Sequence, residues 1–176
     1  MRQNNLRFMT TTAIIAALYT AISLAIPLLQ FSQIQVRFAE ILCLLPILSK
    51  RSIWGIVLGC FLTNLAGAFL AINPLGYYDA IIGTAATLIA CVLTYRFRNI
   101  KFHNLPLLSA LMPVFINAII IGLELAYCFM PNQIILGWLI NGLFVGLGEF
   151  IACVVIGLPV FKLLSNNKKF CNLVNF

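Results

Sequence analysis

The chain alternates long apolar runs with short polar segments. Six runs stand out, at about residues 10–29, 38–48, 53–72, 78–95, 105–129 and 134–164. A helix needs about 20 apolar residues to cross the hydrocarbon core of a bilayer, and all of the runs except the second reach or approach that length. The runs are continuously apolar and lack the alternation that barrel strands show. The pattern predicts an all-α, polytopic membrane bundle of six transmembrane helices, with residues 1–176 as a single integral membrane domain.

Composition supports a membrane location and excludes several other classes of protein. Hydrophobic residues make up 62% of the chain, charged residues make up 9%, and the mean hydropathy is +1.06. Soluble domains carry about 25% charged residues, disordered chains are poor in apolar residues, and coiled coils need charged heptad flanks. We therefore expect a multi-pass protein of the cell membrane. Six spans leave no room for a soluble catalytic domain, so any ATP hydrolysis would belong to a separate chain.

The charged residues are sorted along the chain in a way that indicates an orientation. Eleven Lys and Arg residues stand against four Asp and Glu, which gives a net charge of +7. Cytoplasmic loops of membrane proteins collect Lys and Arg, so the net charge needs no nucleic-acid partner, and both termini are predicted to be cytoplasmic. His103 lies in one of these basic loops and is expected to be solvated. In a six-span bundle ten of the eleven basic residues lie on the predicted cytoplasmic side, and Arg37 lies on the other. The ten are Arg2, Arg7, Lys50, Arg51, Arg96, Arg98, Lys101, Lys162, Lys168 and Lys169.

The four acidic residues all avoid the basic loops. Glu40 and Asp79 lie at the starts of apolar runs on the other side of the bundle. Glu124 is near the outer end of the fifth run, and Glu149 is about halfway along the sixth. A charge at the bilayer centre costs at least about 2.5 kcal/mol, so such acids require a cation, a hydrogen-bonded ligand or one another. Arg37 precedes Glu40 by three residues, and a pair across one helical turn would either staple the loop or contact a ligand.

Side-chain amides accompany the acids. Asn117 and Glu124 are seven residues apart and share one face of a helix, while Asn141 and Glu149, eight apart, can face the same interior. A buried Asn can instead hydrogen-bond neighbouring helices together. Because acids and amides converge in the outer half of the bundle, we favour a binding site over packing alone. The predicted substrate-binding residues are Arg37, Glu40, Asn64, Asp79, Asn117, Glu124, Asn141 and Glu149.

Such a site suits a small polar molecule with several hydrogen-bond donors. A carboxylate accepts two parallel N–H bonds, for example from the ring N–H and exocyclic amine of a guanine-type base. Tyr77, Tyr78 and Trp138 would either stack on a planar ring or lie in the interfacial aromatic belt. No catalytic residue, cofactor or metal ion is predicted. The six cysteines lie singly, mostly within apolar runs, with no close pair of metal-ligand spacing, and indicate packing.

Small residues recur at every fourth position along two of the runs. Gly55, Gly59, Thr63 and Gly67 form a stripe that we expect to pack within the bundle. A second ridge, on the first run, either packs in the same way or faces a partner membrane protein, and it consists of Ala13, Ala17, Ala21 and Ala25.

Several short motifs resemble those of a known transporter family. They lie at residues 35–40 (QVRFAE), 54–64 (WGIVLGCFLTN), 75–79 (LGYYD), 83–88 (GTAATL), 117–124, 146–149 (GLGE) and 157–159 (GLP). Together with the alanine ridge they resemble the QueT-type substrate-binding S-components of energy-coupling factor (ECF) transporters, which are linked with uptake of queuosine precursors. The motifs run through nearly the whole chain.

The resemblance implies a mechanism that composition does not. An S-component binds its substrate from outside and docks on a transmembrane coupling protein that two cytoplasmic ATPase subunits energise. By this resemblance Ala13, Ala17 and Ala21 would dock on the coupling protein, and residues 30–36 would act as a gate. The implied ligand is a 7-deazaguanine: the nitrile or aminomethyl precursor, or the free base queuine. The chain itself would not be an enzyme.

Three alternatives stand beside this hypothesis. The chain could be an S-component for another vitamin-like compound. It could be a stand-alone proton- or ion-coupled transporter, although the sequence lacks the two inverted halves with interrupted helices that such transporters show. An intramembrane enzyme is disfavoured, because the single histidine lies in a loop and no histidine-based metal motif is present.

Overall fold

The computed structural model describes residues 2–31 and 35–174. Apart from an isolated bridge between Phe102 and Leu105, the described residues form helices and loops, which confirms the all-α prediction. In chain order the helices are α1 (Arg2–Ala25), α2 (Pro27–Gln30), η1 (Phe38–Ile47), α3 (Ser52–Phe69), α4 (Tyr77–Arg96), α5 (Leu107–Phe129), η2 (Pro131–Gln133), α6 (Ile134–Glu149), η3 (Phe150–Ile156), α7 (Gly157–Ser165) and α8 (Lys168–Val174).

Five helical stretches are long and apolar enough to cross a membrane, so the chain is a multi-pass membrane protein. They are Asn5–Ala25, Ser52–Phe69, Tyr77–Arg96, Leu107–Phe129 and the continuous stretch Pro131–Ser165. The remaining predicted span, the second run at residues 38–48, is the 3₁₀ helix η1, whose ten residues extend over about 20 Å, against a hydrocarbon core of about 30 Å. Pro46 removes an N–H donor near its end. A sixth crossing therefore stays a prediction.

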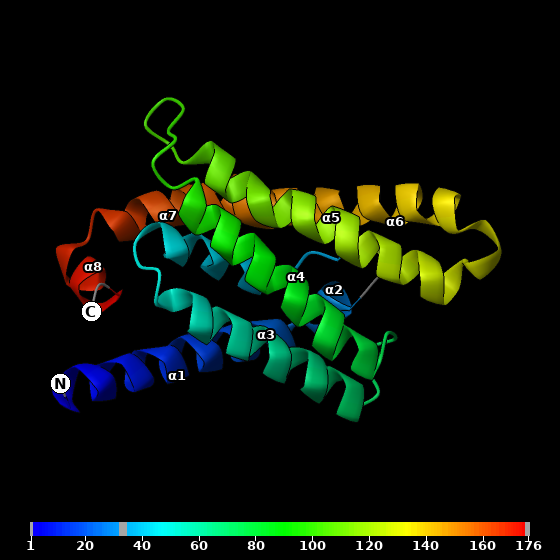
Figure 1. The fold of residues 1–176 in the computed structure, drawn as a ribbon, viewed down its shortest axis with the longest axis horizontal. Coiled ribbons are helices and arrows are strands. Elements are labelled where there is room, and N and C mark those ends of the chain that lie inside the picture. Colours follow the sequence, from blue (N-terminus) through cyan, green and yellow to red (C-terminus); the bar gives the residue numbers. More distant parts are fainter. Residues whose placement is uncertain (1, 32–34, 175–176) are drawn as a thin grey trace.

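The long helices run along one axis of the molecule, and both chain ends lie at the same end of it (Figure 1). The segments that carry the ten basic residues named above also meet there: the start of α1, the η1–α3 and α4–α5 loops, the end of α7, and α8. The prediction that these residues share one side is thus matched by the fold. That this side faces the cytoplasm stays a prediction.

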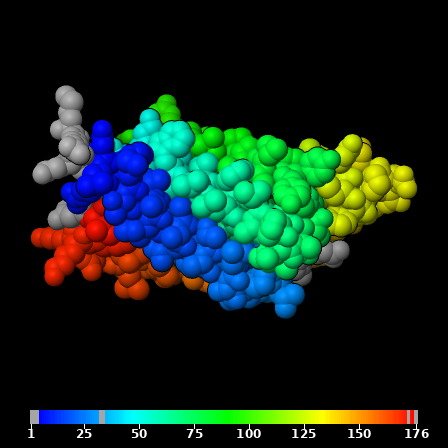
Figure 2. All heavy atoms as spheres, turned by 90° about the horizontal axis from the view of Figure 1, so that it is seen from below, coloured from blue at the N-terminus to red at the C-terminus, as the bar shows by residue number. Residues whose placement is uncertain are grey.

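Helix α1 packs against α3 through two of the stripe glycines. A Cβ atom at Gly55 would lie 2.7 Å from the Ile15 Cβ, and one at Gly59 would lie 2.6 Å from the Tyr19 Cβ. Both separations are too short for any residue other than glycine, so the glycines let the two helices approach closely. Figure 2 shows α1 and α3 side by side on one face of the molecule. The prediction of internal packing is confirmed at these two positions.

The alanine ridge lies on the opposite face of α1. Ala13, Ala17, Ala21 and Ala25 are all exposed, whereas Ile15 and Tyr19 between them are buried. Internal packing of the ridge is therefore wrong, and the ridge forms a smooth surface available to lipid or to another membrane protein.

Candidate binding site

Buried polar side chains concentrate where α1, η1, α3, α4, α5 and α6 meet. Each such group in a membrane protein interior needs a partner within the protein or a ligand, because no bulk water is there to form hydrogen bonds with it. We call this set the central polar cluster; each member exposes 0–1% of its surface, and its members are Tyr19, Gln35, Arg37, Glu40, Asn64, Asp79, Thr87, Asn117 and Glu149.

Arg37 and Asp79 form an ion pair inside the cluster. The Arg37 Nη2 lies 3.5 Å from the Asp79 Oδ2, and neither side chain is exposed. Arg37 Nε also donates to Gln35 Oε1 at 3.0 Å, and Asn73 Nδ2 donates to Asp79 Oδ2 at 2.8 Å. Asn64 Nδ2 donates to the backbone carbonyl of Asp79 at 3.0 Å. Segment 35–37 is thereby tied to the first turn of α4.

The predicted pairing of Arg37 with Glu40 is wrong. Arg37 is the cap residue of η1, with φ −84° and ψ 84°, and so lies outside the helix. Three residues of separation bring side chains together across a helical turn only if both residues are helical. Here Arg37 lies at the centre of a tight turn, in which Phe38 N donates to Val36 O at 3.2 Å, and its side chain pairs with Asp79 instead.

Glu40 joins three helices from the middle of the cluster. Its Oε1 accepts from Tyr19 Oη of α1 at 2.6 Å and from Thr87 Oγ1 of α4 at 3.3 Å. Its Oε2 accepts from Cys43 Sγ at 2.6 Å. With these partners Glu40 fixes η1 between α1 and α4.

Glu149 is held on the other side of the cluster. Asn117 Nδ2 donates to Glu149 Oε1 at 3.0 Å and so bridges α5 and α6. Cys153 Sγ lies 3.7 Å from Glu149 Oε2 and 3.5 Å from the backbone oxygen of Glu40. On the Asp79 side, the Cys60 thiol lies 3.6 Å from Asn64 Nδ2 and 3.2 Å from Thr87 Oγ1. The thiols therefore link the acids into one continuous network.

Several buried polar atoms of this region have no hydrogen-bond partner within the part of the chain that the structure describes. They include both donors and acceptors: Arg37 Nη1 and Nη2, Thr63 Oγ1, Asn64 Oδ1, Asp79 Oδ1 and Asn117 Oδ1. A buried unsatisfied group costs about 1–3 kcal/mol, so a polar ligand that met these atoms would recover that free energy on binding.

Two glycines determine how closely the elements around the cluster approach. A Cβ atom at Gly83 would lie 2.7 Å from Asn64 Nδ2 and would overlap Asp79 Oδ1. A Cβ atom at Gly148 would overlap the backbone carbonyl of Gln35. Side chains at these positions would displace the Asn64–Asp79 pair or push segment 35–37 away from α6.

Glu124 and Asn141 lie outside the network. Asn141 Nδ2 donates to the backbone carbonyl of Gly137 in its own helix at 2.8 Å. Glu124 is 5% exposed, and neither of its carboxylate oxygens has a hydrogen-bond partner among the described residues. It lines a cavity of about 690 Å³ between α4 and α5, together with Tyr78, Ile82, Ile119, Ile120, Leu123, Tyr127 and Cys128. Six of the eight predicted site residues are thus brought together, and two are not.

The three aromatic candidates have different surroundings. Trp138 Nε1 donates to the Ile119 carbonyl at 3.0 Å, which ties α6 to α5. Tyr77 and Tyr78 are 60% and 72% exposed at the start of α4, and Tyr78 borders the cavity beside Glu124. Neither tyrosine belongs to the central polar cluster.

Sequence reasoning missed Tyr19, Asn73, Thr87 and the polar role of three cysteines. Tyr19 had a usable signal: it is two positions after Ala17, so it lies about 200° around the helix from the exposed ridge. The cysteines were expected only to pack. Cys43, Cys60 and Cys153 are free and buried, as packing residues are, but each also meets a polar atom of the network.

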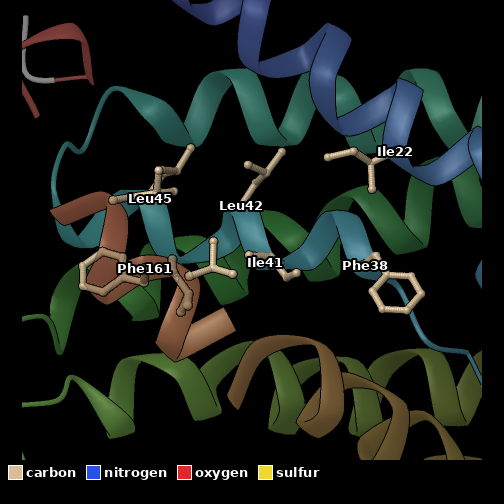
Figure 3. A pocket seen from close by; sticks show the side chains of 9 residues that line it. Ile22, Phe38, Ile41, Leu42, Leu45 and Phe161 are labelled. Atoms are coloured by element: carbon tan, nitrogen blue, oxygen red, sulfur yellow. The ribbon is translucent and has the colours of Figure 1, made fainter. Parts of the chain in front are cut away.

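A second cavity, between α1, η1 and α7, differs in chemistry. It has a volume of about 230 Å³, and Ile22, Phe38, Ile41, Leu42, Leu45 and Phe161 point into it (Figure 3). Its remaining lining residues, Leu44, Val160 and Leu164, are also apolar. This cavity does not suit a polar ligand.

No group of three His, Cys, Asp or Glu side chains within the described ranges could hold a metal ion.

Comparison with protein families gives a match to the QueT transporter family model over residues 9–166. The search of curated proteins gives no match. The search of solved structures gives none either. The family match includes every member of the central polar cluster.

Proposed function

Because the chain belongs to the QueT transporter family, we propose that it is the substrate-binding S-component of an ECF-type importer. In this proposal it binds a 7-deazaguanine queuosine precursor from the outer side and delivers it to the cytoplasm. The ATP-driven step takes place in other subunits. The family match supports a membrane transporter for a small molecule, and the ligand class and the coupling are our additions.

The unsatisfied polar atoms of the central polar cluster carry the ligand assignment. Asn64 Oδ1, Asp79 Oδ1 and Asn117 Oδ1 are acceptors without partners, and Arg37 Nη1 is a donor without one, among the described residues. A guanine-type edge offers two N–H donors beside a carbonyl acceptor, which complements such a set. The proposed substrate-binding residues remain Arg37, Glu40, Asn64, Asp79, Asn117, Glu124, Asn141 and Glu149.

The exposed alanine ridge supports docking on a coupling protein. Ala13, Ala17 and Ala21 present a flat surface over two turns of α1, and small residues let transmembrane helices pack closely. We propose that this surface meets a transmembrane coupling protein, which two cytoplasmic ATPase subunits energise. The end of the bundle that carries both termini and the basic segments would then be cytoplasmic.

The proposed gate at residues 30–36 lies partly outside the described residues, since 32–34 are not among them. On its described side, the Gln35 carbonyl packs against Gly148 of α6, and Val36 N donates to Leu29 O at 3.0 Å. A gate in this position would therefore be anchored at Gln35, a member of the central polar cluster.

A binding experiment on the isolated chain tests this function. Calorimetry on the purified protein, without partners or ATP, is expected to give a dissociation constant on the order of nanomolar for a 7-deazaguanine. Guanine, riboflavin, thiamine and biotin serve as comparison ligands. Tight binding of one of these vitamins would replace the ligand but keep the S-component assignment. Failure of all of these compounds to bind, with a well-folded protein, would contradict the proposed ligand class.

A further inference from the structure

Glu124 differs from the other three acids of the chain in having no partner among the described residues. Asp79 is paired with Arg37, Glu40 accepts from Tyr19 and Glu149 accepts from Asn117. Both carboxylate oxygens of Glu124 lack a hydrogen bond within residues 2–31 and 35–174, although the side chain is 95% buried. An acid left in this state points to a group that the protein itself does not supply.

The cavity beside Glu124 has room for such a group. Its volume of about 690 Å³ lies within the usual range of small-molecule pockets, about 300–1,000 Å³. It lies between the start of α4 and the end of α5, at the end of the bundle opposite both termini (Figure 1). Tyr78 and Tyr127 border it, and Glu124 is its single acidic lining residue. The cavity is an open groove, because Tyr78, Ile119, Leu123 and Tyr127 are also exposed on the outside of the bundle. A buried carboxylate beside such a groove favours a cation over a neutral ligand.

The cavity and the central polar cluster share the first turn of α4. Tyr78 borders the cavity, and the next residue, Asp79, forms the buried ion pair with Arg37. For one ligand to use both, its ring would lie at the cluster and its substituent would reach past this turn to Glu124.

We propose that Glu124 and this cavity bind the protonated primary amine of the transported compound. This inference rests on the proposed function, and it names the substrate class more narrowly: an amine-bearing base rather than a neutral one. An ammonium group has three N–H donors, enough for both Glu124 oxygens, and its charge is stabilised by neighbouring tyrosine rings. The aminomethyl 7-deazaguanine meets this requirement, and its nitrile counterpart does not.

The first test uses that matched pair of ligands, titrated into the purified chain. The wild-type protein is expected to bind the aminomethyl compound at least about tenfold more tightly than the nitrile, the scale of one charged hydrogen bond. Glu124→Gln should reduce the preference to about twofold or less, because it weakens binding of the aminomethyl compound far more than binding of the nitrile, and Glu124→Asp, which keeps the charge, should retain most of it. Equal affinities in the wild-type protein, or equal losses for both ligands in Glu124→Gln, would overturn the inference.

The second test does not depend on deazaguanine binding. Cys128 lines the same cavity and is exposed, whereas Cys43, Cys60, Cys91 and Cys153 are buried. In a Cys171→Ser background, the rate of N-ethylmaleimide labelling therefore reports whether the cavity is occupied. Benzylamine should slow labelling more than benzyl alcohol does, and Glu124→Gln should abolish this difference. Equal effects of the two probes would overturn the inference.

The two tests separate the inference from the proposed function. If no deazaguanine binds but benzylamine protects Cys128 through Glu124, the amine site stands and the ligand is another amine. If both deazaguanines bind equally and benzylamine gives no protection, the function stands and the amine site is wrong.

Labelling of Cys128 in phosphatidylcholine nanodiscs, with and without phosphatidylethanolamine, tests whether a lipid headgroup supplies the amine. Protection by that lipid alone would assign the cavity to a headgroup and overturn the substrate inference.

Discussion

The guanidinium of Arg37 lies 3.5 Å from the carboxylate of Asp79, 42 residues further along the chain, and neither side chain reaches the surface. The pair joins the segment before η1 to the first turn of α4. Because Arg37 Nη1 and Asp79 Oδ1 keep free positions among the described residues, the same pair that fixes the fold also presents a donor and an acceptor to a ligand.

Removing the charge of Asp79 should destabilise the protein strongly. Asp79→Asn leaves the Arg37 guanidinium buried without its counter-ion, and breaking a buried pair in this way costs about 3–5 kcal/mol. The midpoint of thermal unfolding in detergent, followed by intrinsic fluorescence, should fall. The double variant Arg37→Gln/Asp79→Asn should recover much of the stability without recovering ligand binding. A single variant as stable as the wild-type protein would show that the ion pair contributes nothing.

Glu149→Gln should weaken ligand binding more than it weakens folding. The substituted amide can still accept from Asn117, so the α5–α6 bridge survives while the negative charge is lost. We expect binding of the 7-deazaguanine to weaken by at least about tenfold, or 1.4 kcal/mol, in calorimetry.

Ser109→Ala provides the control for Glu149→Gln. Ser109 Oγ donates to the Thr94 carbonyl at 3.0 Å, in a buried contact between α4 and α5 outside the central polar cluster. This variant should lose about 1 kcal/mol of stability but bind ligand normally. Normal affinity in Glu149→Gln would assign a structural role to that acid.

Gly83→Ala should abolish binding although it adds a single methyl group. The new Cβ would lie 2.7 Å from Asn64 Nδ2 and would overlap Asp79 Oδ1, so both side chains must move. Gly146→Ala is the matched control, because its Cβ would meet the Ala118 Cβ at 3.3 Å, a close contact that small shifts relieve. Calorimetry on both variants should show binding lost in the first and kept in the second. Binding retained by Gly83→Ala would place the ligand elsewhere.

Ala17→Phe should separate binding from transport. Ala17 is exposed on the α1 ridge, so a larger side chain meets nothing inside the bundle and should leave ligand affinity unchanged. It should prevent close approach of a coupling protein and abolish uptake of labelled substrate in cells that contain the complete importer. Leu139→Phe, at a 64% exposed position of α6, places the same phenyl ring away from the ridge and should transport normally. Normal uptake by Ala17→Phe would argue against docking through this ridge.

The helical class, the grouping of basic segments and the meeting of six of the eight polar candidates could be predicted from the sequence, while their role in binding stays a prediction. The lengths of the apolar runs reflect bilayer thickness. Burying a charge in a membrane costs free energy, so acids within apolar runs, such as Glu40 and Glu149, can be recognised as candidates from the sequence. The partner of Arg37 could not be predicted, because Asp79 is distant in sequence and only the packing of α4 on η1 brings the two together. The 3₁₀ conformation of Phe38–Ile47 also escaped prediction, since apolar composition does not distinguish a short buried helix from a span.

The last helical stretch sets a condition on the surrounding lipid. Pro131–Ser165 comprises 35 residues, about 50 Å at helical rise, and the α5–α6 hairpin extends well beyond the α3–α4 hairpin in Figure 1. A hydrocarbon layer of about 30 Å cannot cover such a helix standing upright, so its ends extend beyond the layer unless the helix tilts or the bilayer thickens around it. The apolar length of this helix and the thickness of the hydrocarbon layer thus do not match. A thinner membrane would lean the bundle further from the bilayer normal, and a thicker one would straighten it.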